Sequence, residues 1–175
     1  MQSGIGSVFQ AGLQTGPSLA VELISAHTRI GGSVNLGAYT RLPDLLNFHD
    51  EILTVKGARV LNRTGIATAD EAPELDIRLD TMTILVDHSD YVPPADTEVV
   101  EKRAHRMLVV TEAHVITGTF YIYPGAEATA YLRAKEPHWV PMSDVRVRST
   151  IDRRIKLSAG FAVLNRRAVV ATAVA

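Results

Sequence analysis

Short apolar runs rich in Val, Ile and Leu recur along the chain, separated by stretches that are polar or contain Gly or Pro. Such runs are typical of β-strands, because branched side chains pack well on a pleated surface. They occupy residues 21–25, 52–55, 83–86, 106–110 and 169–174. Residues 74–86 add an alternation that places Leu75, Ile77 and Leu79 on one face. The pattern therefore predicts a mostly-β protein.

One segment, residues 39–47, breaks this strand pattern. Leu42, Leu45 and Leu46 have the spacing of one helix face, and Pro43 can open a helical turn. We expect a short helix or a folded loop that covers the strands. Residues 124–132 keep apolar positions at the corresponding place in the second half of the chain.

The pattern around Gly32 returns around Gly118, 86 residues later. Residues 29–34 match residues 115–120, so that Ser33 meets Thr119. With an offset of 87, residues 53–60 match residues 140–147. An offset of 78 then matches Leu79, Leu85 and Val86 with Leu157, Val163 and Leu164, and requires nine extra residues in a polar loop near residues 64–73. We interpret this pattern as an internal repeat.

Gly32 and Gly118 hold the same place in the two copies and are predicted to be structural residues. A Gly inside an apolar run marks a bulge or a sharp bend, because it has no Cβ to clash there. We therefore expect a bent second strand in each copy. The alternative is a hairpin turn at Gly31 and Gly32, which explains the second copy less well.

The repeat divides the chain into a flexible N-terminal arm (residues 1–20), a first β-barrel repeat (21–87), a linker (88–98) and a second β-barrel repeat (99–175). Pro93 and Pro94 mark the linker, since consecutive prolines are semi-rigid and cannot pair in a central strand. Repeats of this size have marginal cores alone. We expect them to pack on each other or on other subunits.

The net charge of −1 hides an asymmetry between the halves. Residues 1–100 hold 6 Lys/Arg and 13 Asp/Glu, whereas residues 101–175 hold 12 and 6. Opposite patches on identical chains favour head-to-tail contact between an acidic first half and a basic second half. Solvated surface charge without such a role is the alternative.

Seven basic residues of the second half are the candidate partner-binding residues. Some alternate with apolar residues, as on one strand face, and others cluster within residues 151–156; a basic β face of this kind suits a phosphate backbone or an acidic protein surface. They are Arg146, Arg148, Arg153, Arg154, Lys156, Arg166 and Arg167. Aromatic residues are too sparse here for binding of single strands by base stacking.

The sequence offers no recognisable catalytic chemistry. It contains no Cys, and its six His are scattered without metal-ligand spacing. His88-Ser89-Asp90 has the letters of a triad, but adjacent side chains rarely face one another productively. We therefore predict no catalytic, cofactor or metal site. No apolar run reaches the length of about 20 residues that a membrane span needs, and we expect a cytoplasmic protein.

Each copy resembles the Sm-like small β-barrel family. The resemblance rests on R-I-G-G-S-V at residues 29–34 and L-T-V-K-G-A-R-V at 53–60, with their counterparts in the second copy. R-L-P-D-L-L-N at residues 41–47 is also similar to the R-L-S-D-x-L-N signature of uncharacterised bacterial small β-proteins. The resemblance implies oligomers and RNA binding, but the Asn and Gly residues with which Sm proteins hold uridines have no clear counterpart. SH3-like barrels would give a similar pattern.

These observations predict a non-enzymatic structural or adaptor subunit that self-associates or docks within a larger protein assembly. The alternative is a nucleic-acid-binding module that uses the basic face of the second repeat. A third hypothesis is an enzyme with a site between the copies.

Overall fold

The computed structural model describes residues 16–49, 51–62, 64–94 and 100–175. Over these ranges the protein is mostly β, as predicted, with two short α-helices. The helices are α1 (Leu42–His49) and α2 (Ala128–Arg133), and two 3-10 turns are η1 (Leu79–Thr81) and η2 (Arg166–Ala168). The strands are β1 (Ser18–Ile24), β2 (Arg29–Asn35), β3 (Ile52–Leu61), β4 (Ala67–Arg78), β5 (Ile84–Asp87), β6 (Arg103–Thr111), β7 (His114–Ile122), β8 (Trp139–Ser149), β9 (Lys156–Asn165) and β10 (Val169–Val174).

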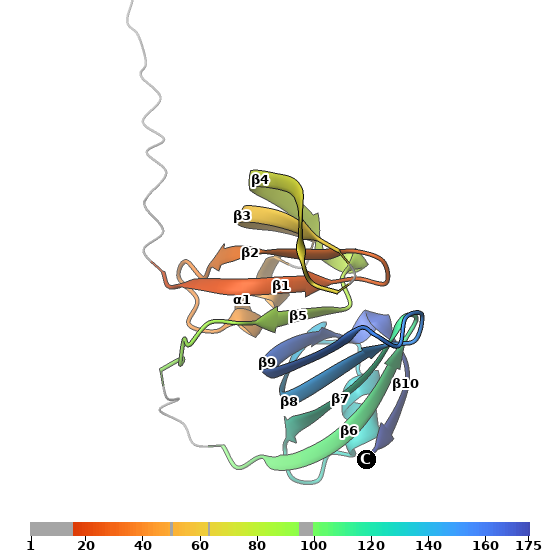
Figure 1. Cartoon of the computed structure of the whole chain (residues 1–175). Coiled ribbons are helices and arrows are strands. Elements are labelled where there is room, and N and C mark those ends of the chain that lie inside the picture. The colour runs from red at the N-terminus through yellow and green to blue at the C-terminus, as the bar shows by residue number, and fades with distance from the viewer. Residues whose placement is uncertain (1–15, 50, 63, 95–99) are drawn as a thin grey trace, which may run out of the picture.

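The ten strands form one antiparallel sheet in the order β10-β6-β7-β8-β9-β5-β1-β2-β3-β4 (Figure 1). The first half of the chain contributes β5-β1-β2-β3-β4 and the second half contributes β10-β6-β7-β8-β9. The halves meet where β5 pairs with β9. Within the described residues the sheet is open, with β10 and β4 at its edges.

Two apolar clusters form the core, one in each half. The predicted helix is α1, whose Leu42, Leu45 and Leu46 are buried in the first cluster. Side chains also cross the junction: Trp139 lies in the first cluster and Ile24 in the second. The halves therefore pack on each other, as their small size leads one to expect.

Strand pairing follows one pattern in both halves. Residue Ile52 of β3 faces Arg78 of β4, and 87 positions later Trp139 of β8 faces Asn165 of β9. The pairing of β2 with β3 shifts register between Gly31 and Ser33, and that of β7 with β8 shifts between Thr117 and Thr119. Both halves thus have a β-bulge or irregularity at the same place.

Gly32 and Gly118 lie inside β2 and β7, at these register shifts. A Cβ on Gly32 would overlap Val55 Cγ1 and lie 2.9 Å from the Lys56 carbonyl oxygen. A Cβ on Gly118 would overlap only the mobile end of Met142 and lie 3.3 Å from the Ser143 carbonyl oxygen. The alternative of a Gly31-Gly32 hairpin turn is wrong, because the chain turns at residues 25–28.

The polar loop predicted near residues 64–73 is wrong, because β4 begins at Ala67. Pro73 lies inside this strand, which is tolerated because β4 is an edge strand and the missing N–H removes no ladder bond on its open side. Its many charged residues are exposed for the same reason. An edge strand with one solvated face therefore resembled a loop in the sequence.

The last step of the predicted alignment, at offset 78, is also wrong. Leu85 and Val163 are cross-strand partners on β5 and β9, and strand order makes β9 the counterpart of β4 and β10 the counterpart of β5. Where they pair, residues 84–86 of β5 and 162–164 of β9 are buried on both faces and read as continuous apolar runs, which align with one another at several offsets.

The predicted terminal and linking segments are described in part. Residues 1–15 of the arm and residues 95–99 of the linker lie outside the described residues. The strand β1 begins at Ser18, inside the range predicted as arm. Residues 88–94 contain no helix or strand.

Substitution of Gly32 by Ala should lower the free energy of unfolding by roughly 1–3 kcal/mol, since backbone and a branched side chain must move. Gly118→Ala should cost less, because the end of Met142 can rotate away. Chemical denaturation of the two variants measures the difference. Equal, negligible losses would contradict the close packing at Gly32.

Candidate interaction surfaces

The structure divides the seven predicted basic residues into two groups. Arg146 and Arg148 lie exposed on β8, where Arg148 is directly opposite Lys156 of β9. Arg153 and Arg154 lie in the turn between β8 and β9, and Arg154 forms an ion pair with Asp152 at 2.8 Å. These five residues share one hairpin.

Arg166 and Arg167 lie at the opposite end of β9, in η2. Arg166 is 6% exposed, donates to the Pro137 carbonyl oxygen at 2.8 Å and lies over the Tyr131 ring. Burial lowers the pKa of its guanidinium. Arg166 is therefore part of the packing, while Arg167 is exposed and contacts His138 Nε2 at 2.9 Å.

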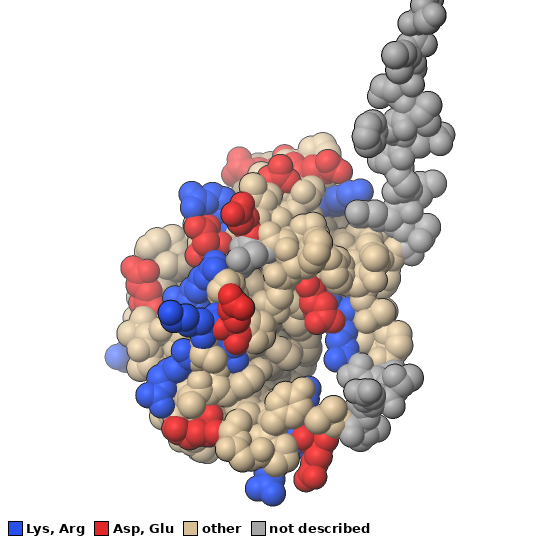
Figure 2. All heavy atoms as spheres, turned by 180° about the vertical axis from the view of Figure 1, so that it is seen from behind, with Lys and Arg blue, Asp and Glu red and all other residues tan. Residues whose placement is uncertain are grey.

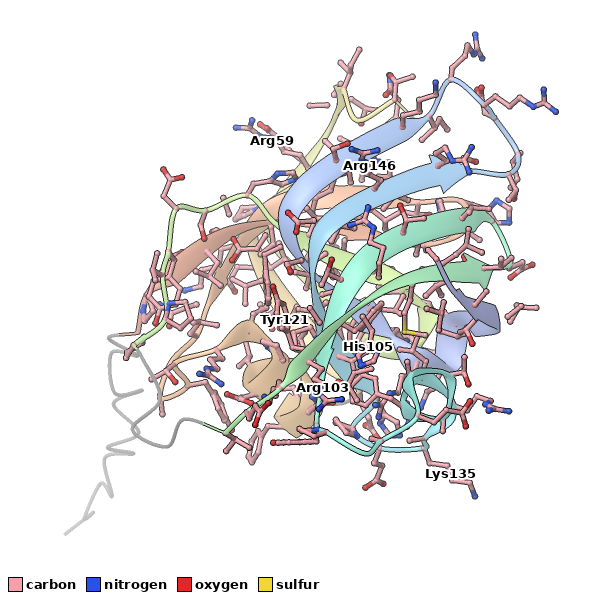
Figure 3. The ribbon with its side chains drawn as sticks, turned by 90° about the horizontal axis from the view of Figure 1, so that it is seen from below. Arg59, Arg103, His105, Tyr121, Lys135 and Arg146 are labelled. Carbon is pink, nitrogen blue, oxygen red and sulfur yellow. The ribbon has the colours of Figure 1, made fainter. Side chains whose placement is uncertain are left out.

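A cavity of about 530 Å³ lies beside the edge strand β10. Its apolar lining comes from α2 and from β10, and its basic lining comes from the end of α2, from the segment that follows it and from η2. The basic residues are Arg133, Lys135, His138, Arg166 and Arg167. Figure 3 shows Lys135 far from Arg146, on the other side of the second half. We call this cavity the β10 cavity. Its basic lining makes it a second basic surface, separate from the β8–β9 hairpin.

Sequence reasoning missed Arg133, Lys135 and His138 in this cavity. They join Arg167 only because α2 packs against β10, and no local spacing reveals that contact. A comparison of α2 with the predicted helix at residues 39–47 could have placed Arg133 beside the last strand, because the two segments occupy matching positions.

The opposite edge of the sheet is acidic. The strand β4 carries Asp70, Glu71, Glu74 and Asp76, all exposed. Glu74 pairs with Lys56 at 3.8 Å and Glu71 with Arg59 at 3.9 Å, but these solvated pairs contribute little stability. Figure 2 shows acidic side chains gathered along the upper edge of the molecule, where β4 lies in Figure 1.

Exposed apolar side chains also lie at the two edges. Val170 and Val174 of β10 are 73% and 61% exposed, and Ile52 at the start of β3 is 51% exposed. Within the described residues, the outer side of each edge strand is unpaired, and apolar side chains are exposed close to it. This combination is typical of sites where a strand of another chain docks.

The buried polar groups at the junction of the halves have structural roles. Glu22 and Arg29 form a buried ion pair, and His88 Nε2 lies 3.2 Å from Glu22 Oε2. Ser89 Oγ donates to Asp87, so His88, Ser89 and Asp90 form no triad. The adjoining cavity, of about 30 Å³, has room for little more than a water molecule.

His114 is the one histidine on which burial acts strongly among the described residues. It is 5% exposed, and burial together with the positive charge of Arg29 lowers its pKa below 6.5. Its Nδ1 has no hydrogen-bond partner among the described atoms. Burial in the folded protein therefore favours the neutral form of this ring.

Among the described residues, no group of three His, Cys, Asp or Glu could hold a metal ion. Within the same ranges, no helix is long and apolar enough to cross a membrane. Comparisons of the chain with protein-family models, with curated proteins and with solved structures find no match. The two sheet edges and the basic hairpin are the surfaces from which a function can be argued.

The lowered pKa of His114 predicts a loss of stability in mild acid. The unfolded chain takes up this proton below about pH 6.5 while the folded protein resists it, so stability is complete above that pH and falls as the pH decreases. Denaturation at pH 7.5, 6.5 and 5.5 should show a slope of up to about 1.4 kcal/mol per pH unit from this group.

The variant His114→Leu should flatten this slope, whereas His27→Gln should keep it, because His27 is exposed. A slope that is unchanged in His114→Leu would show that another group titrates.

Proposed function

We propose that the protein is a non-enzymatic structural subunit that self-associates end to end, and that its halves are two copies of one Sm-like small β-barrel unit. Shared strand order, matching registers and a glycine at each register shift support the two copies. To be a barrel, each half would also need the two outer strands of its part of the sheet to meet, and the strand order of the described residues contains no such pairing. The proposal of self-association needs only the strand order.

The junction of β5 with β9 carries this proposal. There the last strand of the first half pairs antiparallel with the fourth strand of the second half, over four residue pairs from Ile84–Leu164 to Asp87–Phe161. The free edges are of the same two kinds: β4 is the fourth strand of its half and β10 is the last strand of its half. Each chain therefore carries one edge of each kind, at opposite ends of the sheet.

Pairing of β10 with β4 of a second copy would repeat the internal junction. Such a contact is heterologous, so it leads to a ring or to a filament, depending on the rotation between copies. The main-chain groups on the outer sides of both strands would then gain partners. Within one chain the two edges lie too far apart to meet, as Figure 1 shows.

Charge gives this contact its direction. The edge at β4 presents Glu74 and Asp76, while the β10 cavity presents Arg133, Lys135 and Arg167. Contact of β4 with β4, or of β10 with β10, would oppose like charges, which is unfavourable. Opposite charges favour the head-to-tail arrangement and raise the rate of encounter.

Light scattering tests this proposal. The molar mass should exceed that of one chain at 0.1 M salt and decrease toward it at 1 M, because the screening length shortens from about 10 Å to about 3 Å. Reversal of charge in Glu74→Lys with Asp76→Lys should weaken assembly at least tenfold.

The control is Arg153→Glu with Arg154→Glu. The sequence made both residues candidates for partner binding, but they lie in the β8–β9 turn, away from both edges, so on this proposal their reversal should leave assembly unchanged. A single-chain mass at every salt and protein concentration would contradict self-association.

A second candidate function is nucleic-acid binding by the β8–β9 hairpin. The observation in its favour is that Arg146, Arg148 and Lys156 are exposed together on adjacent strands. Tyr121 and Tyr123 of the same half are also half exposed, which adds some stacking surface. This surface does not overlap the two sheet edges.

Titration of single-stranded RNA at several salt concentrations tests this second function. Binding should weaken with salt, and the triple reversal Arg146→Glu, Arg148→Glu and Lys156→Glu should reduce the salt slope by about 2. Affinity that does not respond to these changes would exclude the hairpin as the site. The Glu74 and Asp76 variant serves as the matched control, because it leaves the hairpin intact.

A further inference from the structure

We infer that the β10 cavity is the slot that receives Ile52 and Asp76 of a second copy, with Thr172 of β10 directly opposite Asp76. This inference rests on the proposed self-association and specifies its contact and its register. It follows from the way in which the corresponding slot inside the chain is filled.

At the internal junction, the second half inserts two side chains into the first. Trp139, at the start of β8, is 1% exposed and lies in the first apolar cluster, together with Val163 of β9. Asn47 of α1 holds Trp139 by accepting from its backbone N–H at 2.8 Å and donating to its carbonyl oxygen at 2.9 Å. Leu46 of α1, Leu79 of η1 and Leu85 of β5 belong to the same apolar cluster, and we call this region the internal slot.

The β10 cavity is built from the matching elements of the second half. Its lining comes from α2 in place of α1, from η2 in place of η1 and from β10 in place of β5. Leu132 of α2 corresponds to Leu46 of α1, and Thr172 of β10 corresponds to Leu85 of β5. Within the described residues, no further strand pairs with β10 to fill this second slot.

Two residues at the other edge hold the positions of the inserted pair. Ile52 faces Arg78 as Trp139 faces Asn165, so Ile52 is the counterpart of Trp139. Ile52 is 51% exposed, although its counterpart is fully buried. Asp76 is likewise the counterpart of Val163, since they are two residues before Arg78 and Asn165 on β4 and β9.

The chemical differences between the two slots are complementary. Where the internal slot is apolar and receives Val163, the β10 cavity has a basic lining and would receive the carboxylate of Asp76. Ile52 would lie against Leu132 and Val169, and Asp76 within reach of Arg133, Lys135 or Arg167. A carboxylate among cations that is shielded from water binds more strongly than a surface ion pair.

Transfer of the internal register fixes the pairing between copies. The internal pairs are Ile84–Leu164, Leu85–Val163, Val86–Ala162 and Asp87–Phe161. Their counterparts between β10 of one copy and β4 of the next are Ala171–Ile77, Thr172–Asp76, Ala173–Leu75 and Val174–Glu74. The exposed pair Val174–Glu74 is accessible to a test by disulfide formation.

Disulfide trapping tests the register, because the chain contains no Cys of its own. A Val174→Cys protein mixed with a Glu74→Cys protein under mild oxidation should give a covalent dimer. A Val174→Cys protein mixed with an Ala72→Cys protein should give at least tenfold less, because a shift of two residues along β4 moves the Cα atoms apart by about 7 Å and Ala72 has no part in the proposed contact.

Substitution of Ile52 tests the slot. Ile52→Ala should weaken assembly about tenfold, as expected for loss of a half-buried aliphatic side chain, and Ile52→Lys should abolish it. The matched control is Ile66→Ala, which removes a side chain of similar exposure, 66%, from the β3–β4 loop. Circular dichroism and denaturation show that each variant is folded.

The outcomes separate this inference from the function on which it rests. Assembly that persists in Ile52→Lys, or that cross-links only through the Ala72 position, overturns the slot and register but leaves self-association standing. A protein that is a single chain under all conditions overturns both. Selective cross-linking at Glu74 with loss of assembly in the Ile52 variants supports both.

Discussion

The pairing of β5 with β9 is the interaction on which the rest of the structure depends. Neither half has enough residues for a large core of its own. Where they pair, both strands are buried on both faces: Leu85 of β5 and Val163 of β9 lie in the first cluster, and their neighbours on both strands lie in the second. Each cluster is thus completed by a strand of the other half. Separation of the halves would expose both cores, so they fold as one sheet.

The sequence was sufficient to predict those helices, strands and glycines whose local residue pattern determines their structure. The spacing of Leu42, Leu45 and Leu46 predicted α1. Gly32 and Gly118 were recognised because they hold matching places, and the structure gives the physical reason: a Cβ would clash with its neighbours at Gly32 and would be crowded at Gly118. The second part of β4 was predicted from the alternation that starts at Glu74, whereas its first part, residues 67–73, was missed because its residues are polar or charged and include Pro73. Only the sheet order reveals that it is an edge, where both features are tolerated.

The candidate site was harder to predict than the fold. Arg166 and Arg167 are consecutive and were both expected to bind a partner, yet Arg166 is buried over Tyr131 while Arg167 is exposed at the β10 cavity. Arg133 and Lys135, which complete that cavity, are distant from them in sequence. Three-dimensional packing of α2 on β10 decides which charges act together, and side-chain type alone does not.

On the proposed account, one kind of strand pairing serves twice with different chemistry. The internal junction is apolar and joins the halves permanently, as expected for surfaces that never meet water in the folded chain. The outer junction would combine one apolar contact at Ile52 with charges on both sides, so that its strength depends on salt and concentration. A protein with both kinds of junction can be a stable monomer in dilute solution and assemble reversibly.

Amide hydrogen exchange as a function of protein concentration tests the central claim most directly. The account predicts that amides on the outer sides of β4 and β10 become protected as the concentration rises at low salt, while those of the central strand β7 do not change. The contradicting result would be found at salt concentrations where the molar mass exceeds that of one chain. If the exchange rates at both edge strands do not depend on protein concentration there, these edges do not join the copies.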